Sequence, residues 1–195
     1  MGQKTSKLRK DDISGLKQET KFTTREIQQW YKGFTRDAPS GRLTREDFIK
    51  IHEQFYPFGD PTEFATISFD AFDVNQLGYI DFKDFITSLS IASRGSMSEK
   101  LKWAFRMYDR DRDGYIGYED LSTVVKSIYK MIGTQCVRFR NEEITAESRV
   151  DRIWQAFSKR LEEKETQNIS LAEFTDYKRL DPEVLSSLSV YNDLV

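Results

Sequence analysis

The chain has 195 residues, of which 38% are hydrophobic and 32% are charged, and its formal net charge is −2. No apolar run approaches the roughly 20 residues of a membrane-spanning helix, and the balanced charge gives no support for nucleic-acid binding. A single cysteine, Cys136, excludes an internal disulfide and favours a reducing compartment. The N-terminus lacks the apolar core of a secretory signal, so we expect a soluble, cytoplasmic protein.

The first residues predict a lipid-modified N-terminus. The stretch Met1–Ser6 matches the N-myristoylation pattern, with Gly2 as the acceptor. Four cations stand among the first ten residues, with no acid between them: Lys4, Lys7, Arg9 and Lys10. One acyl chain binds a bilayer only marginally, and a basic run adds attraction to anionic lipids. We interpret residues 1–22 as a myristoylated basic arm of a peripheral membrane protein; the alternative is a frayed, solvated tail.

One sequence unit then recurs along the chain. Glycines at Gly41, Gly78 and Gly114 are spaced by 37 and then 36 residues. An apolar residue follows each glycine by two positions, and a fourth comes after a longer gap: Leu43, Ile80, Ile116 and Ile169. Each of these loops follows an aromatic-rich segment, so a helix–loop–helix unit is repeated. We expect the four apolar residues to pair in twos as short antiparallel bridges between loops.

The first loop, 36–47, is a poor cation site. It begins with a cation, Arg36, and carries Ala38 and Pro39 where a ligand should stand. We expect it to bind no metal.

The second loop, 73–84, is impaired. Its candidate ligands are Asp73, Asn75, the carbonyl of Tyr79, Asp81 and Asp84. Leu77, however, replaces the oxygen ligand of the fifth position. Because a buried cation needs its oxygen ligands, we expect weak binding at best.

The third loop, 109–120, has every ligand that a calcium-binding EF-hand loop requires. Carboxylates stand at the first, third and fifth positions, a backbone carbonyl at the seventh and an acid at the twelfth: Asp109, Asp111, Asp113, Tyr115 and Asp120. Gly114 permits the sharp turn at the sixth position. We predict the strongest Ca²⁺ site of the protein here.

Aspartate at the twelfth position leaves the choice of cation open. Asp84 and Asp120 are one methylene shorter than the usual glutamate, which favours fewer oxygen contacts and hence Mg²⁺. The third loop is therefore an ordinary Ca²⁺ site, a weak one, or a site that holds Mg²⁺ at rest.

The fourth segment lacks a coherent loop. Counting back from Glu173 places Lys164 and Gln167 at the third and sixth positions. Counting forward from Ser158 leaves Ile169 four residues too late, so either register makes this hand structural. Together the units predict an all-α fold of four EF-hands in two lobes, residues 23–92 and 97–178, joined near Ser93–Gly95, with a tail at 179–195.

The chain resembles the neuronal calcium sensor family, and its frequenin branch in particular. The motifs that carry the resemblance span nearly the whole chain: M-G-x-x-x-S-K-L at the start, R-E-I-Q-Q-W-Y-K-G-F (25–34), P-S-G (39–41), F-Y-P-F-G-D-P (55–61), S-R-G (93–95), K-L-x-W-A-F (100–105), I-Y-K-M-I-G (128–133) and Y-N-D-L-V (191–195). The resemblance implies a myristoylated calcium sensor with an inactive first hand. It also implies targets such as phosphatidylinositol 4-kinase, receptor kinases, exchange factors or ion channels. The chain departs from the frequenin pattern of three binding loops.

The resemblance further implies a hydrophobic groove in the N-terminal lobe that holds an amphipathic target helix. We assign to it Trp30, Phe34, Phe48, Ile51, Phe55, Phe85 and Leu89, with continuation toward Trp103. Leu185, Leu188 and Val190 of the tail either occupy this groove in the absence of a target or form ordinary structure. Oligomeric state is left open.

An enzyme has little support in the sequence. His52 is the single histidine, expected on the surface of the first hand, and Cys136 has no evident base. No phosphate-cradling glycine loop is present. The favoured function is a membrane-attached calcium sensor; the alternative is a Mg²⁺-loaded or calcium-independent adaptor or regulatory subunit.

Overall fold

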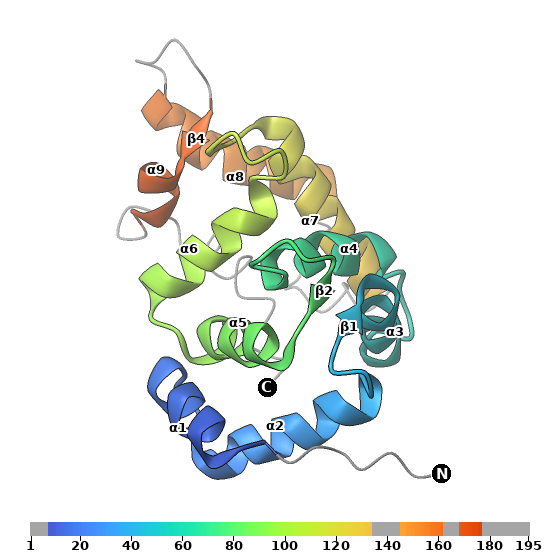
Figure 1. Cartoon of the computed structure of the whole chain (residues 1–195). Coiled ribbons are helices and arrows are strands. Elements are labelled where there is room, and N and C mark those ends of the chain that lie inside the picture. The colour runs from blue at the N-terminus through green and yellow to red at the C-terminus, as the bar shows by residue number, and fades with distance from the viewer. Residues whose placement is uncertain (1–7, 134–144, 162–167, 177–195) are drawn as a thin grey trace.

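Paired helix–loop–helix units form two lobes, as Figure 1 shows. The structure is a computed structural model and describes residues 8–133, 145–161 and 168–176. Gly2, Lys4, Lys7, Cys136, residues 162–167 of the fourth loop and the tail from 177 onward lie outside the described residues. The elements are α1 (Lys10–Glu19), α2 (Thr24–Asp37), β1 (Leu43–Thr44), α3 (Arg45–Phe55), α4 (Thr62–Phe72), β2 (Tyr79–Ile80), α5 (Phe82–Arg94), α6 (Met97–Tyr108), β3 (Tyr115–Ile116), α7 (Tyr118–Ile132), α8 (Ala146–Leu161), β4 (Ile169–Ser170) and α9 (Leu171–Thr175). The predicted all-α EF-hand fold is confirmed.

The predicted bridges between loops are present. Leu43 pairs with Ile80 between β1 and β2, and Ile116 pairs with Ile169 between β3 and β4, both antiparallel. All four side chains are buried. The longer fourth loop therefore still delivers its apolar residue to the bridge.

Side-chain caps fix where several helices begin. Thr23, Ser96 and Ser170 each accept a hydrogen bond from the backbone N–H three residues later, and a glutamate at that position bonds back to the cap. Thr44 and Asp81 cap α3 and α5 through their side chains. Each such cap stabilises a helix by about 1 kcal/mol, so the local sequence sets the starts of the helices that hold the loops.

A backbone contact joins the two lobes. The N–H of Asp60, in the turn between α3 and α4, donates to the carbonyl of Lys130 near the end of α7 at 2.8 Å. A Cβ on the neighbouring Gly59 would lie 2.0 Å from the carbonyl oxygen of Met131. A Cβ on Gly133, which has φ +59°, would lie 2.3 Å from the carbonyl oxygen of Phe58 in the same turn. Because no side chain fits between these backbones, the two glycines are what let the lobes meet here.

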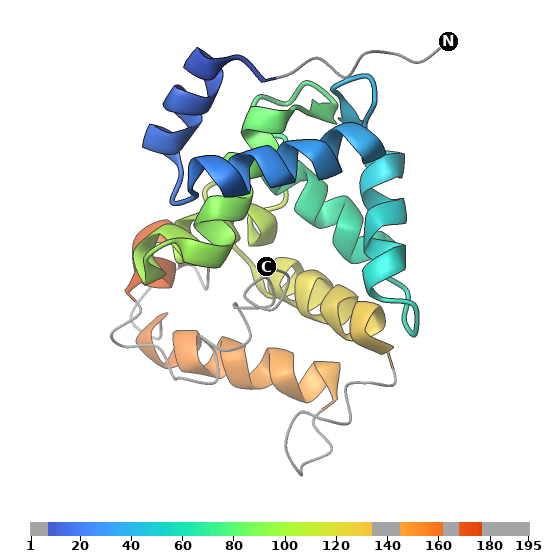
Figure 2. The ribbon, with the colours of Figure 1, turned by 90° about the horizontal axis from the view of Figure 1, so that it is seen from below.

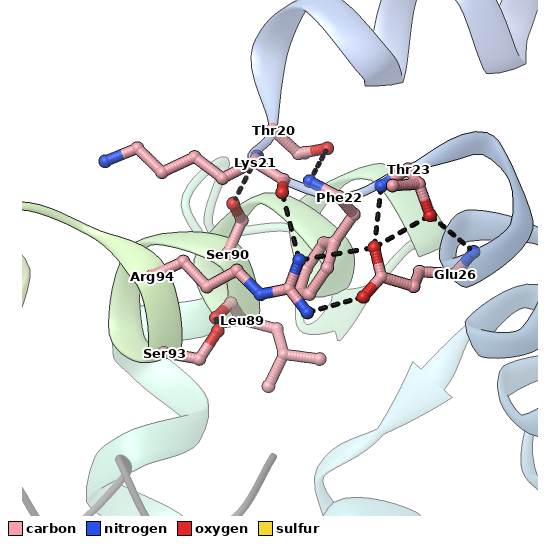
Figure 3. Close-up of polar contacts among 9 residues, drawn as sticks. All are labelled: Thr20, Lys21, Phe22, Thr23, Glu26, Leu89, Ser90, Ser93 and Arg94. Atoms are coloured by element: carbon pink, nitrogen blue, oxygen red, sulfur yellow. Dashed lines mark hydrogen bonds and ion pairs between the residues drawn. The ribbon is translucent and has the colours of Figure 1, made fainter.

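A second contact holds the turn between α1 and α2 against the end of α5 (Figure 3). The guanidinium of Arg94 lies 4.5 Å from the ring centre of Phe22 and donates to the carbonyl of Lys21 at 3.1 Å. It also pairs with Glu26, and this hydrogen bond is the main reason why the pKa of Glu26 falls to about 2. The backbone N–H of Lys21 donates to Ser90 at 2.8 Å. Figure 2 shows α2 and α8 on opposite sides of the molecule, with α7 between them.

Candidate functional site

The third loop brings three carboxylates to one point. Asp109, the residue after α6, lies close to Asp111 and Asp113, and the three residues have ligand oxygens within 4.8 Å of one another. The Oδ2 atom of Asp109 accepts from the N–H of Gly114 at 3.2 Å, whereas Oδ1 is buried without a hydrogen-bond partner. Burial is the main cause that raises the pKa of Asp109. An unpaired carboxylate oxygen on a residue that is clustered with two further acids fits a divalent cation, which would satisfy the oxygen and offset the repulsion between the carboxylates.

The rest of this loop is arranged by its own backbone. Asp111 and Asp113 accept from the N–H groups of Asp113 at 3.3 Å and Tyr115 at 2.8 Å. Gly114 has φ +89°, as the sixth position requires. Asp120 lies in the first turn of α7, and its Oδ2 accepts from the N–H of Gly117 at 3.0 Å. One oxygen of Asp120 is thus used in the helix cap, which leaves Oδ1 as the atom that would reach a cation.

The second loop does not fit a divalent cation in the same way. Both oxygens of Asp73 accept from backbone N–H groups, of Leu77 at 2.9 Å and of Gly78 at 2.8 Å. The side-chain amide of Asn75 donates to Asp84 at 3.1 and 3.4 Å. Leu77 is 53% exposed at the fifth position. Within the described ranges, the third loop supplies the one cluster of three candidate ligands among Asp, Glu, His and Cys.

The carboxyl group of Asp84 is held in a buried, acidic setting. Burial, followed by the nearby charge of Asp81, raises the pKa of Asp84. The donor role of Asn75 was missed by sequence reasoning, because an asparagine serves equally as an oxygen ligand or as an N–H donor.

The first loop is arranged as a structural turn. Ala38, at its third position, is 1% exposed and packs in the core, and Arg36 pairs with Asp37 at 2.8 Å. Gly41 has φ +76° and keeps the turn.

The seven residues assigned to the groove line one pocket of about 190 Å³. Phe34, Phe48 and Leu89 are buried at its floor, while Trp30, Ile51 and Phe85 are half-buried. Phe55 is 64% exposed at its rim. Additional lining residues include Leu43, Tyr56 and Phe72. Trp103 of α6 lies outside this lining but contacts Phe72 edge-on, with ring centres 5.5 Å apart.

The expectation that His52 lies on the surface was wrong. The ring is 6% exposed, lines the same pocket, and its Nδ1 lies 2.9 Å from the carbonyl of Phe48. Burial lowers its pKa. The signal was present in the sequence, since residues four apart share a helix face and Phe48 was assigned to the pocket.

In the described part of the N-terminal arm, one of the four basic side chains forms an ion pair. Arg9 pairs with Asp12 at 3.0 Å, at the start of α1, while Lys10 is exposed. From Lys10 onward the chain forms α1, whose Leu16 is buried. No helix among the described residues combines the length and apolarity needed to cross a bilayer.

Comparisons with known proteins agree with this geometry. A family profile described as an EF-hand domain pair matches residues 98–179, and a second profile of that description matches residues 39–92. Neuronal calcium sensor 1 of Lymnaea stagnalis is 45% identical over 190 residues, covering 97% of both chains. Neuronal calcium sensor 1 of Aplysia californica is 46% identical over the same share of both chains. The resemblance found in the motifs is therefore confirmed, and the chain belongs to the neuronal calcium sensor family of EF-hand, calcium-binding proteins.

Proposed function

We propose that this protein is a membrane-attached calcium sensor, not an enzyme, whose third loop binds Ca²⁺ and whose N-terminal pocket holds an amphipathic helix of a target protein. The observation that carries the proposal is the cluster of Asp109, Asp111 and Asp113, in which the Oδ1 atom of Asp109 is buried without a hydrogen-bond partner. A cation held by these carboxylates, the carbonyl of Tyr115 and Asp120 would satisfy that oxygen.

Packing connects the third loop to the pocket. Asp109 follows directly on α6, and Trp103 of α6 packs against Phe72, which lines the pocket. A cation that draws the end of α6 toward the loop would therefore move a side chain in contact with the pocket wall. Calcium binding in sensor EF-hands acts through such helix movements.

The pocket fits the apolar face of a helix. Its walls are aromatic and aliphatic, and Phe55 stands exposed at the rim, where a side chain of a partner would cover it. A phosphatidylinositol 4-kinase or a signalling receptor or channel is the class of target that we propose.

The basic arm supports attachment to an anionic, cytosolic membrane surface through a myristoyl group on Gly2. One acyl chain gives a binding constant of roughly 10⁴ M⁻¹, so a second attraction is needed. Since Arg9 is partly offset by Asp12, the lysines of the arm carry most of that attraction. Gly2→Ala should release the protein from anionic vesicles in flotation, and attachment that survives unchanged would assign the anchor to another surface.

A calorimetric titration with Ca²⁺ tests the sensor assignment. The unaltered protein should bind Ca²⁺, and Asp109→Ala should remove the major binding event because it deletes the orphaned oxygen. Tryptophan fluorescence should follow occupancy, since Trp103 lies in the helix that enters the loop. Unchanged stoichiometry in the Asp109→Ala protein would refute the assignment.

A second candidate function, a Mg²⁺-loaded adaptor, is favoured by Asp120. Its short side chain already uses one oxygen on the N–H of Gly117, which reduces the oxygens left for a cation. Repeating the Ca²⁺ titration with Mg²⁺ at about 1 mM separates the two candidates. A sensor keeps a Ca²⁺-dependent change in fluorescence, whereas an adaptor of this kind shows none.

A further inference from the structure

The second loop uses the atoms that a cation would need for its own hydrogen bonds. The two oxygens of Asp73 are taken by the N–H groups of Leu77 and Gly78, at 2.9 and 2.8 Å. In the third loop, the equivalent Asp109 offers one oxygen to Gly114 and keeps the other without a partner. The loops therefore differ in the atoms that are free to bind, as well as in residue types.

The contact between Asn75 and Asp84 closes the second loop. The amide nitrogen of Asn75 lies 3.1 and 3.4 Å from the two oxygens of Asp84. Turning the amide over would set its carbonyl oxygen against the carboxylate, which is repulsive, so electrostatics selects the donor arrangement. The third and twelfth positions, which a cation would join through its coordination shell, are here joined directly.

The two ends of the second loop are adjacent in sequence to two residues of the pocket wall. Asp73 follows Phe72 at the end of α4, and Asp84 precedes Phe85 in the first turn of α5. Both phenylalanines line the pocket, with ring centres 6.3 Å apart. Phe85 also packs on Trp30 at 6.0 Å and on Phe34 at 5.5 Å. Holding Asp84 to the loop therefore holds α5 and the pocket wall in position.

We infer that the second loop is closed by the Asn75–Asp84 hydrogen bond in place of a cation, and that this bond keeps the aromatic pocket formed whether or not Ca²⁺ is present. The inference deepens the proposed function and rests on it for the assignment of Ca²⁺ to the third loop. The N-terminal lobe would then hold its binding pocket open to a target at all times. A cation would act on the protein only through the third loop, in the other lobe. Leu77, an exposed apolar side chain at a ligand position, is compatible with such a loop.

Two isosteric exchanges distinguish a hydrogen-bonded loop from a cation-bound one. Asn75→Asp adds a potential ligand but deletes the donor, whereas Asp84→Asn deletes a ligand but keeps an oxygen that accepts from Asn75. Both are made in the Asp109→Ala background, which removes the third-loop site. If the loop is closed by the hydrogen bond, the first exchange destabilises the folded protein and the second changes its stability little. If the loop holds a cation, the effects on stability are reversed.

Thermal unfolding with Ca²⁺ present at about 1 mM is the first measurement, because a cation-bound loop shows the reverse pattern only when the cation is available. Asn75→Asp should lower the melting temperature by roughly 4–8 °C, because a charge-assisted hydrogen bond becomes a repulsion between carboxylates. Asp84→Asn should shift it by less than about 2 °C. Equal losses in the two variants, or a larger loss in Asp84→Asn, would overturn the inference.

Two further measurements leave the second loop unaltered, so they do not depend on how those variants fold. Calorimetry of the Asp109→Ala protein should show no Ca²⁺ binding up to about 1 mM, the weak end of EF-hand affinities. The apolar dye 8-anilinonaphthalene-1-sulfonate should bind this protein equally in EDTA and in Ca²⁺. A Ca²⁺ binding event in the Asp109→Ala protein, or dye binding that requires Ca²⁺, would overturn the inference. Absence of Ca²⁺ binding to the unaltered protein would instead refute the proposed function.

Discussion

The second and third loops share a backbone and differ in what their oxygens do. Gln76 and Arg112, at the fourth position of each loop, both have positive φ, 56° and 61°. Gly78 and Gly114 follow with φ of 75° and 89°. With the same turn, the second loop has a hydrogen bond from the amide of Asn75 to Asp84, whereas the third loop has a cluster of three acids with one unpaired oxygen. The EF-hand turn is therefore separable from cation binding, and the side chains decide which of the two closes it.

The comparison is tested most directly by placing the leucine of the second loop in the third loop. Asp113→Leu places leucine at the fifth position, as Leu77 does. Ca²⁺ affinity should fall at least about 100-fold, which is about 2.7 kcal/mol. In EDTA the same variant should unfold at a higher temperature than the unaltered protein, because one of three clustered carboxylates is gone. Calorimetry and thermal unfolding measure the two effects, and unchanged affinity would refute the ligand set.

The reciprocal change should turn the second loop into a cation site. The double variant Asn75→Asp, Leu77→Asp removes the amide donor and restores acids at the third and fifth positions. We expect a second Ca²⁺ binding event with a dissociation constant of about 10 to 100 μM, because the twelfth position remains aspartate. Leu77 is exposed, so its replacement removes little packing. A stoichiometry that stays at one would mean that the loop is barred from binding by more than its side chains.

Lengthening the twelfth position should sharpen the contrast further. Asp120→Glu keeps the charge and adds the methylene that lets both oxygens reach a cation. Ca²⁺ affinity should rise about tenfold, equivalent to about 1.4 kcal/mol, with Mg²⁺ affinity rising less. Competition of the two ions in fluorescence titrations measures the ratio, and an increase that is equal for both ions would contradict the coordination argument.

The pocket offers a matched pair of exposed phenylalanines. Phe55, 64% exposed, lines the pocket, whereas Phe58, 67% exposed, does not. Phe55→Ala should reduce binding of the apolar dye about threefold to tenfold, as expected for losing about 1 kcal/mol of apolar contact, and Phe58→Ala should leave it unchanged. In the Asp109→Ala background the ratio between the variants should be equal in EDTA and in Ca²⁺. Equal losses from both variants would show that the dye binds elsewhere.

Much of the architecture could be predicted because the repeat leaves periodic marks. The spacing of Gly41, Gly78 and Gly114 predicted the loops, and the apolar residue two positions later predicted the bridges, including Ile116 with Ile169. The clustering of Asp109, Asp111 and Asp113 followed from alternate residues in a tight turn. Features that depend only on the spacing of residues along the chain can therefore be predicted from the sequence.

Other features were beyond such patterns because they depend on partners from distant segments. The direction of the Asn75 amide is set by Asp84, and one residue type permits either role. The burial of His52 depends on Phe64 as well as on Phe48, with ring centres 6.3 and 4.5 Å away. The backbone approach of Gly59 to Met131 joins segments about seventy residues apart, and no local periodicity encodes it.

The smallest expected effect concerns the junction between the helices that serve the two loops. Arg94, at the end of α5, pairs with Glu26, and Lys21 pairs with Glu99 of α6 at 2.7 Å. The hydrogen bond from Arg94 lowers the pKa of Glu26 from 4.5 to about 2. Since the folded pKa lies below the unfolded one, this pair stabilises the fold above pH 4.5, and its contribution is lost as pH falls through about 2.

A ¹³C titration of the Glu26 carboxyl carbon should therefore show a midpoint near 2, returning toward 4.5 in the Arg94→Gln protein. The pair is exposed to solvent, so its stabilisation is small, and Arg94→Gln should lower the melting temperature at neutral pH by less than about 2 °C. Because the second loop is held by Asn75 and the third by its own acids, Glu26→Gln should change Ca²⁺ affinity by less than about twofold. A larger change would mean that the junction carries signals between the loops, and that they cannot be compared as independent sites.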